Sequence, residues 1–469
     1  MKQDFMKAAP ILLLLLFLPV LVFVAERGQH YIGRAREIPA NIVIETNNIT
    51  GPLPHNWKAL AQGGEEKGVR MLANVLSDTA ELSPRYIRID HMYDFYDVVR
   101  KDRLGSLVFQ WDQLDATVCD ILRIGARPFF SLGYMPEFLS TDGSLIDAPR
   151  NWQEWELLVQ STVERYSAKD PRICGPAYDS QLTDVYYEVW NEPDLETFGK
   201  WSIHGGRKDY KLLYYYSAQG AQKAQGVQRF FLGGPAITAV YQNWMQLFLR
   251  YANAYQLRVD FLSWHHYSSD PAGYRTDMVK VDAWLTGDEF ERYRTIPRII
   301  SEWGFDSNPN PLSETEIAAA HTIATIRHLV EEKLEMAFAF EIKDGQEPRW
   351  GIMSYTGAKK PRYYGLKLLN VLGRSRLTVT GEGTWVSALA SREFGTIAAV
   401  IVNYDLTSTH HETVPVTFTG LPAGRYQLTQ QDLTGVESSA VFTVNQSGTL
   451  SRILSMKPNS AYALQLKSL

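Results

Sequence analysis

The chain alternates between short β-prone runs and longer amphipathic runs, and this alternation restricts its possible folds more than any other feature. Apolar residues recur at helical spacing between the β-prone runs, as in 111–125, 151–166, 208–225 and 314–332. The eight predicted strands are NIVIET (41–46), RYIRIDH (85–91), ARPFFSLG (126–133), VYYEVW (185–190), RFFLGGP (229–235), VDFLSWHH (259–266), IPRIIS (296–301) and MAFAFEI (336–342).

Eight strand–helix repeats predict an α/β fold of the (β/α)8 or TIM-barrel type, in which parallel strands close into a barrel surrounded by helices. An open doubly wound sheet is the alternative. No glycine-rich fingerprint follows the first run, and eight strands suit closure, so the barrel is favoured. We predict that it spans residues 38–372.

Beyond residue 372 the pattern changes to short runs of alternating apolar and polar residues, with Leu421-Pro422-Ala423-Gly424 as a turn. This pattern predicts a C-terminal all-β, sandwich-like domain over residues 373–469. The clearest runs are 396–405, 412–420, 424–433 and 460–469.

The N-terminal segment, residues 1–30, contains the apolar run ILLLLLFLPVLVFVA at 11–25, which is barely long enough to cross a bilayer. Cleavage after Ala25 would leave the bulky Phe23 where signal peptidase prefers a small residue, so a membrane anchor is favoured over a cleaved signal peptide. We therefore expect export. The large domain would lie in the periplasm, anchored to the inner membrane, or would be secreted if the segment is cleaved.

Composition excludes several functions. The chain has 47 Lys+Arg and 52 Asp+Glu, a net charge of -5, and no basic cluster, so no nucleic-acid partner is expected. Cys119 and Cys174 are not spaced as metal ligands. A single disulfide between them is one possibility, but Cys119 lies in an apolar helical pattern, which favours a buried thiol. Neither a metal cluster nor a nucleotide loop is present, and we expect no cofactor.

Polar side chains follow three of the predicted strands at their C-terminal ends, where a TIM barrel builds its active site. Two of them are carboxylic acids, Glu192 after the fourth strand and Glu302 after the seventh, and they would face one cleft. Pro193 would stop the fourth strand beside Glu192. The polar set is Asn191, Glu192, His265, His266, Tyr267, Ser301 and Glu302.

Two carboxyl groups across a cleft are the catalytic groups of glycoside hydrolases, in which one must be protonated and the other ionised. Burial beside Trp190 and a neighbouring negative charge would raise one pKa, whereas a donor such as Tyr267 would keep the other group ionised. Indole faces could stack on the apolar faces of sugar rings. The tryptophans near predicted strand ends are Trp201, Trp264, Trp303 and Trp350.

With these motifs the chain resembles glycoside hydrolase family 39, which contains β-xylosidases, α-L-iduronidase and bacterial endoglycosidases that process exopolysaccharides. An Asn-Glu-Pro after a strand also recurs across the wider superfamily of retaining enzymes, so the other motifs carry the family resemblance. The matching pieces are YIRIDH, ARPFFSLGYMP, VWNEPD, FLSWHHY, SEWG and WGIMSYTGAKKPRYYGLKLL (350–369).

The resemblance implies double displacement with retention of configuration, with Glu192 as general acid and base and Glu302 as nucleophile. Such a pair is spaced at about 5 to 5.5 Å. Asn191 would bind the hydroxyl next to the reacting carbon, and Tyr267 would hold Glu302. The remaining predicted substrate contacts are His265, His91, Trp303, Trp350 and Trp201, although either histidine could instead be structural and Trp303 and Trp350 could instead pack in the core.

The eighth strand departs from the family pattern, because AFAFEIKDG offers Phe340 and a third acid, Glu341, where a tryptophan is expected. The long segment 268–294 is predicted to wall the cleft. A retaining glycosidase that cleaves an exopolysaccharide internally is the favoured function, since a membrane anchor suits it. The alternatives are an exo-acting β-xylosidase-like enzyme, a non-hydrolytic sugar-binding barrel and a transglycosylase.

Overall fold

The computed structural model describes residues 37–63 and 66–469. The N-terminal apolar run, and with it the expected anchor or signal segment, lies outside the described residues. Within the described part, we find no helix whose length and apolarity would let it cross a membrane.

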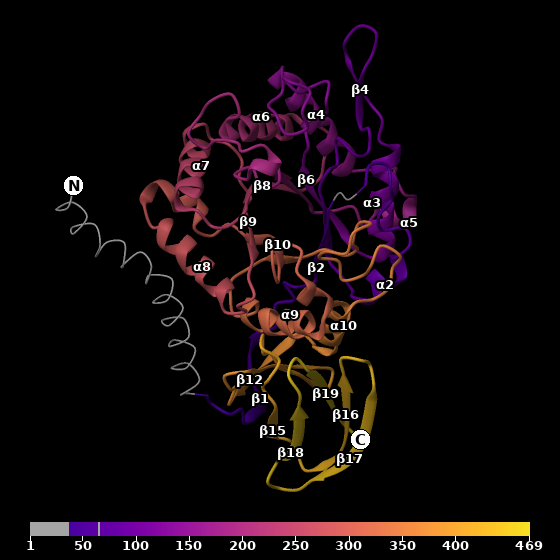
Figure 1. Ribbon diagram of the computed structural model, residues 1–469, viewed down its shortest axis with the longest axis vertical. Helices are drawn as coiled ribbons and strands as arrows, with labels where there is room; N and C mark the ends of the chain where they lie inside the picture. The colour runs from indigo at the N-terminus through magenta and orange to yellow at the C-terminus, as the bar shows by residue number, and fades with distance from the viewer. Residues whose placement is uncertain (1–36, 64–65) are drawn as a thin grey trace, which may run out of the picture.

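Eight parallel strands form a closed barrel, as predicted, and the open sheet is excluded. Seven of them lie where the sequence predicts strands. Helices surround the barrel in Figure 1. In order around the barrel the strands are β2 (Ala59–Gln62), β3 (Tyr86–Ile89), β6 (Arg127–Leu132), β7 (Val185–Val189), β8 (Phe230–Ile237), β9 (Phe261–Tyr267), β10 (Arg298–Gly304) and β11 (Met336–Phe340).

The four predicted helical runs all form helices with recognisable ends. Asn151 and Asp209 cap two of them through side chains that accept backbone N–H groups, and Gly125 ends another with a left-handed φ of 91°. The helices are α2 (Leu76–Glu81), α3 (Asp112–Ile124), α4 (Trp152–Tyr166), α5 (Pro176–Asp179), α6 (Tyr210–Lys223), α7 (Gln242–Ala254), α8 (Gly273–Trp284), α9 (Glu316–Leu329) and α10 (Pro361–Leu368). Short 3-10 turns are η1 (Glu196–Phe198), η2 (Asp288–Tyr293), η3 (Pro311–Glu314) and η4 (Leu369–Val371).

The lower interior of the barrel is filled by apolar side chains from all eight strands. Phe129 lies at its centre, with ring centroids 4.7 Å from Phe338 and 5.6 Å from Phe261. Because side chains alternate along a strand, positions two residues further on also face inward. Arg88 follows Tyr86 in this way, and Glu188 follows Tyr186, so charged groups lie directly above the apolar layer.

The first predicted strand is not part of the barrel, and that prediction is wrong. Residues Ile42–Pro52 form β1, which pairs antiparallel with β12 (Ser375–Thr380) and parallel with β15 (Glu412–Thr419) of the C-terminal sheet. The first barrel strand is β2 instead. Its sequence, Ala-Leu-Ala-Gln, is short and lacks β-branched residues, so it carries almost no strand signal.

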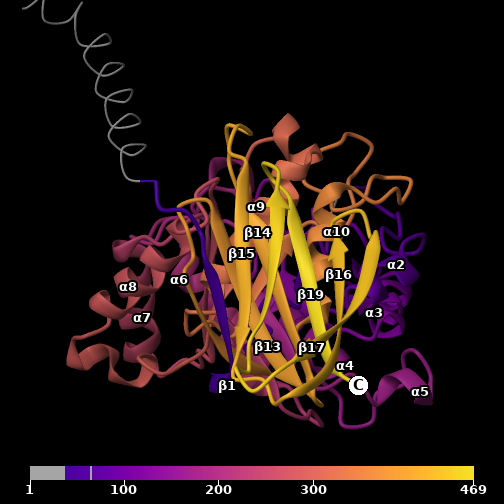
Figure 2. The same ribbon diagram turned by 90° about the horizontal axis from the view of Figure 1, so that it is seen from below.

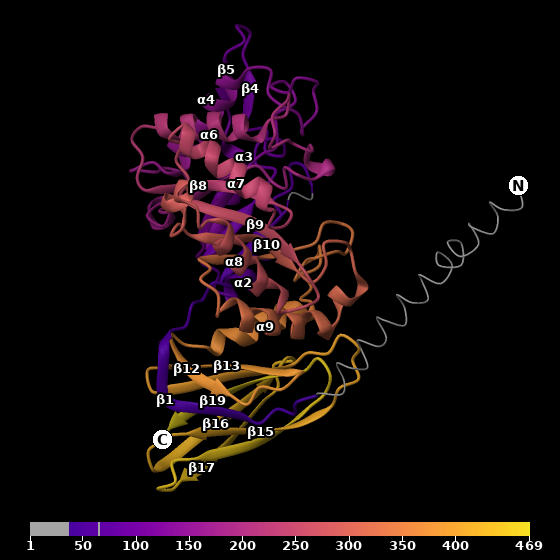
Figure 3. The ribbon, with the colours of Figure 1, turned by 90° about the vertical axis from the view of Figure 1, so that its left-hand side faces the viewer.

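The C-terminal domain is a nine-stranded, sandwich-like sheet that includes β1, and one apolar core binds its strands together. Figure 2 shows its strands from below, and in Figure 3 it lies beneath the barrel with the indigo β1 among its strands. The order is β17-β16-β19-β14-β13-β12-β1-β15-β18. The remaining bounds are β13 (Val386–Glu393), β14 (Thr396–Asn403), β16 (Gly424–Asp432), β17 (Glu437–Val444), β18 (Leu450–Met456) and β19 (Ala461–Ser468).

Two features lie at the periphery of the barrel. A small hairpin, β4 (Val99–Lys101) with β5 (Leu107–Phe109), projects from it in Figure 1. Cys119 of α3 forms a disulfide with Cys174, so the favoured pair of unbonded thiols is wrong. Cys119 is buried among apolar residues, as its sequence pattern indicates. The loop before α5 packs against α3 and places the sulfur of Cys174 beside that of Cys119.

Candidate active site

A cleft of about 1040 Å³ lies at the C-terminal ends of the barrel strands. Residues from six different strand ends or following loops line it, including Asp90, Asn191 and Glu192, Tyr267, Glu302 and Trp350. Segment 268–294 walls part of it through α8, as predicted. The strand ends therefore bring the two predicted acids into one cleft.

The two acids lie close together across this cleft. One carboxylate oxygen of Glu192, one of Glu302 and a ring nitrogen of His265 all lie within 4.8 Å of one another. Inverting glycosidases separate their acids by about 6.5 to 9.5 Å to admit a water, whereas retaining enzymes hold them at about 5 to 5.5 Å. The spacing here matches the retaining arrangement.

Glu192 is aimed into the cleft by an unusual backbone at the end of β7. Trp190 and Glu192 have φ values of 71° and 42°, a left-handed region that costs non-glycine residues on the order of 1 kcal/mol each. The Glu192 amide donates to the Ala236 carbonyl at 2.9 Å, and the Trp190 indole donates to the Phe198 carbonyl at 2.9 Å. These bonds hold the turn that the sequence shows as Asn-Glu-Pro.

Glu302 owes its orientation to an irregularity in β10. Ile300 pairs with Trp264, but the next pair is Glu302 with His265, so Ser301 is an extra residue. Ile299 faces the barrel interior, and without this bulge Glu302 would point away from it. The bulge turns the carboxylate inward and brings it level with His265.

Arg88 lies beneath the acids and binds three side chains at once. Its guanidinium donates to Glu302 Oε1 at 2.8 Å, to Glu188 Oε2 at 2.8 Å and to Asn191 Oδ1 at 2.7 Å. Asn191 in turn donates to the Tyr134 hydroxyl at 3.0 Å. Arg88 is not among the site residues predicted from the sequence. The signal was an arginine inside the apolar run YIRI, which requires a buried acidic partner.

Two further side chains contact the acids. The Tyr267 hydroxyl donates to Glu302 Oε2 at 2.7 Å, and His265 Nδ1 lies 2.9 Å from Glu192 Oε1 and 3.4 Å from Glu302 Oε2. Gly304 leaves room for the tyrosine, because a Cβ there would lie 3.0 Å from its ring. Tyr267 thus contacts Glu302 as predicted, and His265 reaches both acids.

Burial and charge set the protonation of the site. Burial raises the pKa of Glu302, with the Glu192 charge adding to it, while His265 and Arg88 oppose the rise. Burial lowers the pKa of His265, but Glu302 and Glu192 outweigh that effect and raise it overall. The Arg88 guanidinium and the Tyr267 hydroxyl both donate to Glu302, and these bonds favour its ionised form against the effect of burial.

The acids and His265 have the spacing of a possible metal site, the sole such group among residues 37–63 and 66–469. The fit is poor, however. Arg88 already places a positive charge 2.8 Å from Glu302, and that charge would repel a cation bound there. The arrangement suits acid–base and nucleophilic chemistry by the side chains themselves.

Residues 71–428 match the family model described as "Glycosyl hydrolases family 39". The chain belongs to this family. It is therefore a retaining O-glycosyl hydrolase with a carbohydrate substrate.

Named relatives agree with this assignment. A β-xylosidase from Caldicellulosiruptor saccharolyticus is 26% identical over 361 residues, which are 70% of each chain. The crystal structure of a family 39 enzyme from Xanthomonas axonopodis pv. citri has a TM-score of 0.74 at 18% identity and covers 92% of this chain and 98% of its own. A monomeric β-xylosidase structure from Caulobacter crescentus has a TM-score of 0.73 at 18% identity, covering 92% and 100%.

Three tryptophans proposed for sugar stacking in this family 39 site are buried away from the cleft, so these predictions are wrong. The alternation along β10 that points Glu302 inward points Trp303 outward, where Tyr274 packs edge-on against it and Arg362 lies 5.1 Å from its ring centroid. Trp201 packs against Trp190, and the Trp264 indole donates to Asp277 at 3.0 Å.

Other predicted contacts lie differently. Trp350 lines the cleft, and its indole donates to the Asp306 carbonyl at 3.1 Å. His91 is not among the described residues that line the cleft, since it pairs with Asp94 at 2.7 Å and stacks on Phe95. Its neighbour Asp90 lines the cleft instead, a position that the sequence analysis overlooked. Glu341 is buried near the site. Burial raises the pKa of Tyr267, and the charges of Glu302, Glu192 and Glu341 add to that rise.

Proposed function

We propose that this enzyme removes β-xylosyl units from oligosaccharides or polysaccharides by double displacement. The observation that carries the proposal is the pair Glu192 and Glu302 within 4.8 Å, with Arg88 and Tyr267 both donating to Glu302. The relatives named β-xylosidase support the sugar class.

In the first step, Glu302 attacks the anomeric carbon while Glu192 donates its proton to the departing glycosidic oxygen. A covalent glycosyl-enzyme forms, and the released chain end carries the proton. In the second step, Glu192 removes a proton from water, which attacks the same carbon and displaces Glu302. Two inversions give net retention.

An endo-acting enzyme for an exopolysaccharide is the second candidate. It is supported by the size of the cleft, about 1040 Å³, and by the neighbouring pocket that shares Val240, Tyr241 and Lys280 with it, which together can hold more than one sugar unit. A transglycosylase would use the same glycosyl-enzyme with a sugar hydroxyl in place of water.

We also propose that the catalytic domain works outside the cytoplasm, tethered to the membrane by its N-terminal segment or released by cleavage. The disulfide between Cys119 and Cys174 supports this location, because such bonds persist mainly in oxidising compartments.

The test is an assay of residues 37–469 on aryl β-xylosides, other aryl glycosides and polysaccharides, with NMR of the first anomer formed. We expect β-xyloside turnover and a first product of retained configuration. Inversion would contradict the mechanism. Release of oligosaccharides from within a polymer would favour the endo-acting candidate, and chain lengthening with added acceptor would indicate a transglycosylase.

A further inference from the structure

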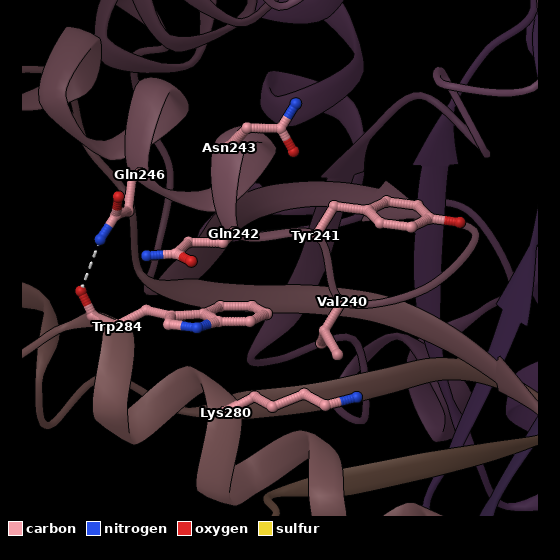
Figure 4. A pocket seen from close by; sticks show the side chains of 7 residues that line it. All are labelled: Val240, Tyr241, Gln242, Asn243, Gln246, Lys280 and Trp284. Atoms are coloured by element: carbon pink, nitrogen blue, oxygen red, sulfur yellow. Dashed lines mark hydrogen bonds between the residues drawn. The ribbon is translucent and has the colours of Figure 1, made fainter.

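A second pocket of about 480 Å³ adjoins the active-site cleft, between the start of α7 and the last turns of α8 (Figure 4). Val240, Tyr241 and Lys280 line both cavities. A substrate chain bound across the catalytic pair can therefore pass these three residues and enter the pocket without leaving the protein surface.

The lining of this pocket suits a sugar ring. Trp284 is half-buried, and Tyr241 is 43% exposed, so both present aromatic surface to a ligand. Gln246 donates to the Trp284 carbonyl at 2.9 Å, which ties α7 to α8. The Gln242 amide lies beside the indole in Figure 4, where it can bond to a sugar hydroxyl.

Lys280 gives the pocket a positive charge. Its side chain is exposed and forms no ion pair with any described residue. Asp277, one turn earlier on α8, is engaged by His266 at 2.5 Å and by Trp264 at 3.0 Å. Asp282 pairs with Arg298 at 2.7 Å. In Figure 4 the ammonium group extends away from Trp284, in the same direction as the ring of Tyr241.

We propose that this pocket is a distal subsite for an acidic sugar, in which Lys280 pairs with the carboxylate of a uronic acid carried by the substrate chain. The inference rests on the proposed glycosidase function and specifies its substrate further. The glycosidic bond that is cleaved lies at Glu192 and Glu302. The uronic acid unit of the substrate lies further along the chain, beyond Tyr241.

The first experiment compares kcat/KM for xylo-oligosaccharides with and without a glucuronic acid side group, at equal chain length. We expect the wild-type enzyme to favour the acidic substrate about threefold to fivefold, the upper part of the range for an exposed ion pair. Raising NaCl from about 0.02 to about 0.5 M should reduce the preference, since salt screens exposed charges.

Three variants locate the preference. Lys280→Met keeps the aliphatic stem and should remove the preference, and Lys280→Glu should reverse it. Lys333→Met is the matched control, because Lys333 is exposed and precedes β11 at the opposite end of the barrel from the cleft. An unchanged preference in Lys280→Met, or no preference in the wild-type enzyme, would overturn the proposal.

A binding measurement separates this proposal from the proposed function. Calorimetric titration of the same two oligosaccharides into Glu302→Gln needs no turnover. Tighter binding of the acidic sugar that disappears in Glu302→Gln/Lys280→Met would support the subsite even if hydrolysis of β-xylosides failed. Turnover of β-xylosides with equal binding of both oligosaccharides would leave the function intact and refute the subsite.

Discussion

Arg88 and Glu302 form an ion pair of 2.8 Å at the centre of the barrel, and their side chains are only 1% and 6% exposed. The same guanidinium also pairs with the fully buried Glu188 at 2.8 Å. One cation therefore stabilises two buried carboxylates, of which only Glu302 lines the cleft. The stability of the fold and the ionisation of Glu302 therefore depend on the same side chain.

Replacing Arg88 by Met should reduce both. Breaking a buried ion pair leaves unpaired charge and lowers the free energy of unfolding by about 3 to 5 kcal/mol. Arg88 holds down the pKa of Glu302, so its loss raises that pKa, and the acid limb of the pH–kcat/KM profile should move to higher pH. Urea unfolding and pH–rate profiles measure these effects. Arg88→Lys retains the charge and should give a smaller shift; equal shifts would contradict the charge argument.

Substitution of each acid proposed for catalysis should block a different step of the reaction. Glu192→Gln should lower kcat/KM on oligosaccharides about 10²- to 10⁴-fold, yet still be glycosylated by a dinitrophenyl glycoside, whose leaving group needs no proton. Azide should then restore turnover and give a glycosyl azide. Glu302→Gln should not form the glycosyl-enzyme at all, as mass spectrometry would show. Glu196→Gln, an exposed acid of η1, is the control. Labelled enzyme in Glu302→Gln would refute the assignment.

Tyr267→Phe should lower kcat about 10- to 100-fold, because hydrogen bonds to charged groups contribute about 1.5 to 3 kcal/mol. The hydroxyl donates to ionised Glu302, so its removal should raise the pKa of Glu302 and move the acid limb upward. Tyr364→Phe, on the outer surface of α10, serves as control. A changed KM with an unchanged kcat and pH profile would indicate that Tyr267 contacts substrate only.

His321 predicts how stability depends on pH. Burial, with the charge of Arg362, lowers its pKa from 6.5 to about 3, and its Nε2 lies 2.7 Å from the Ser268 carbonyl. In the unfolded chain His321 is protonated below about pH 6.5, whereas in the folded protein it stays neutral down to about pH 3. The contribution of neutral His321 to the free energy of unfolding is fully present above pH 6.5. Below that pH it falls by about 1.4 kcal/mol per pH unit.

His321→Gln removes that titration while retaining a donor for Ser268. Its unfolding free energy should therefore decline less steeply than that of the wild-type protein between about pH 6 and pH 4. His204→Gln, at an exposed position, should follow the wild type. Parallel curves for wild type and His321→Gln would show that His321 is not the group responsible.

Periodicity predicts the barrel well because seven of its strands are rich in β-branched and aromatic residues and are separated by helical patterns. The acids could also be predicted, since Glu192 lies just beyond β7 and Glu302 lies near the end of β10. To predict which way the side chains of Trp303 and Arg88 face, the register of each strand must be known. Alternation from Glu302 would have sent Trp303 outward, but the bulge at Ser301, which sets that register, has no local sequence signal.

The first strand fails for a different reason. Residues 42–46 have a strong strand pattern, whereas β2 is short and rich in alanine. Local sequence indicates that β1 is a strand but not which sheet it joins, because its partners β12 and β15 lie far along the chain. The disulfide is similar. Cys174 meets Cys119 only after the intervening helix and loop have folded.

The pairing of β1 affects how the protein is made. Pro52 lies opposite Ser375, so β1 leaves the ribosome long before its partner strands exist. At about 5 to 20 residues per second, synthesis of the intervening chain takes roughly 15 to 65 s. Throughout that interval the edges of β1 remain open to other chains, and the barrel is complete before the sheet can close. A ribosome-stalled or truncated product ending before residue 375 would therefore carry β1 as an unpaired, aggregation-prone strand.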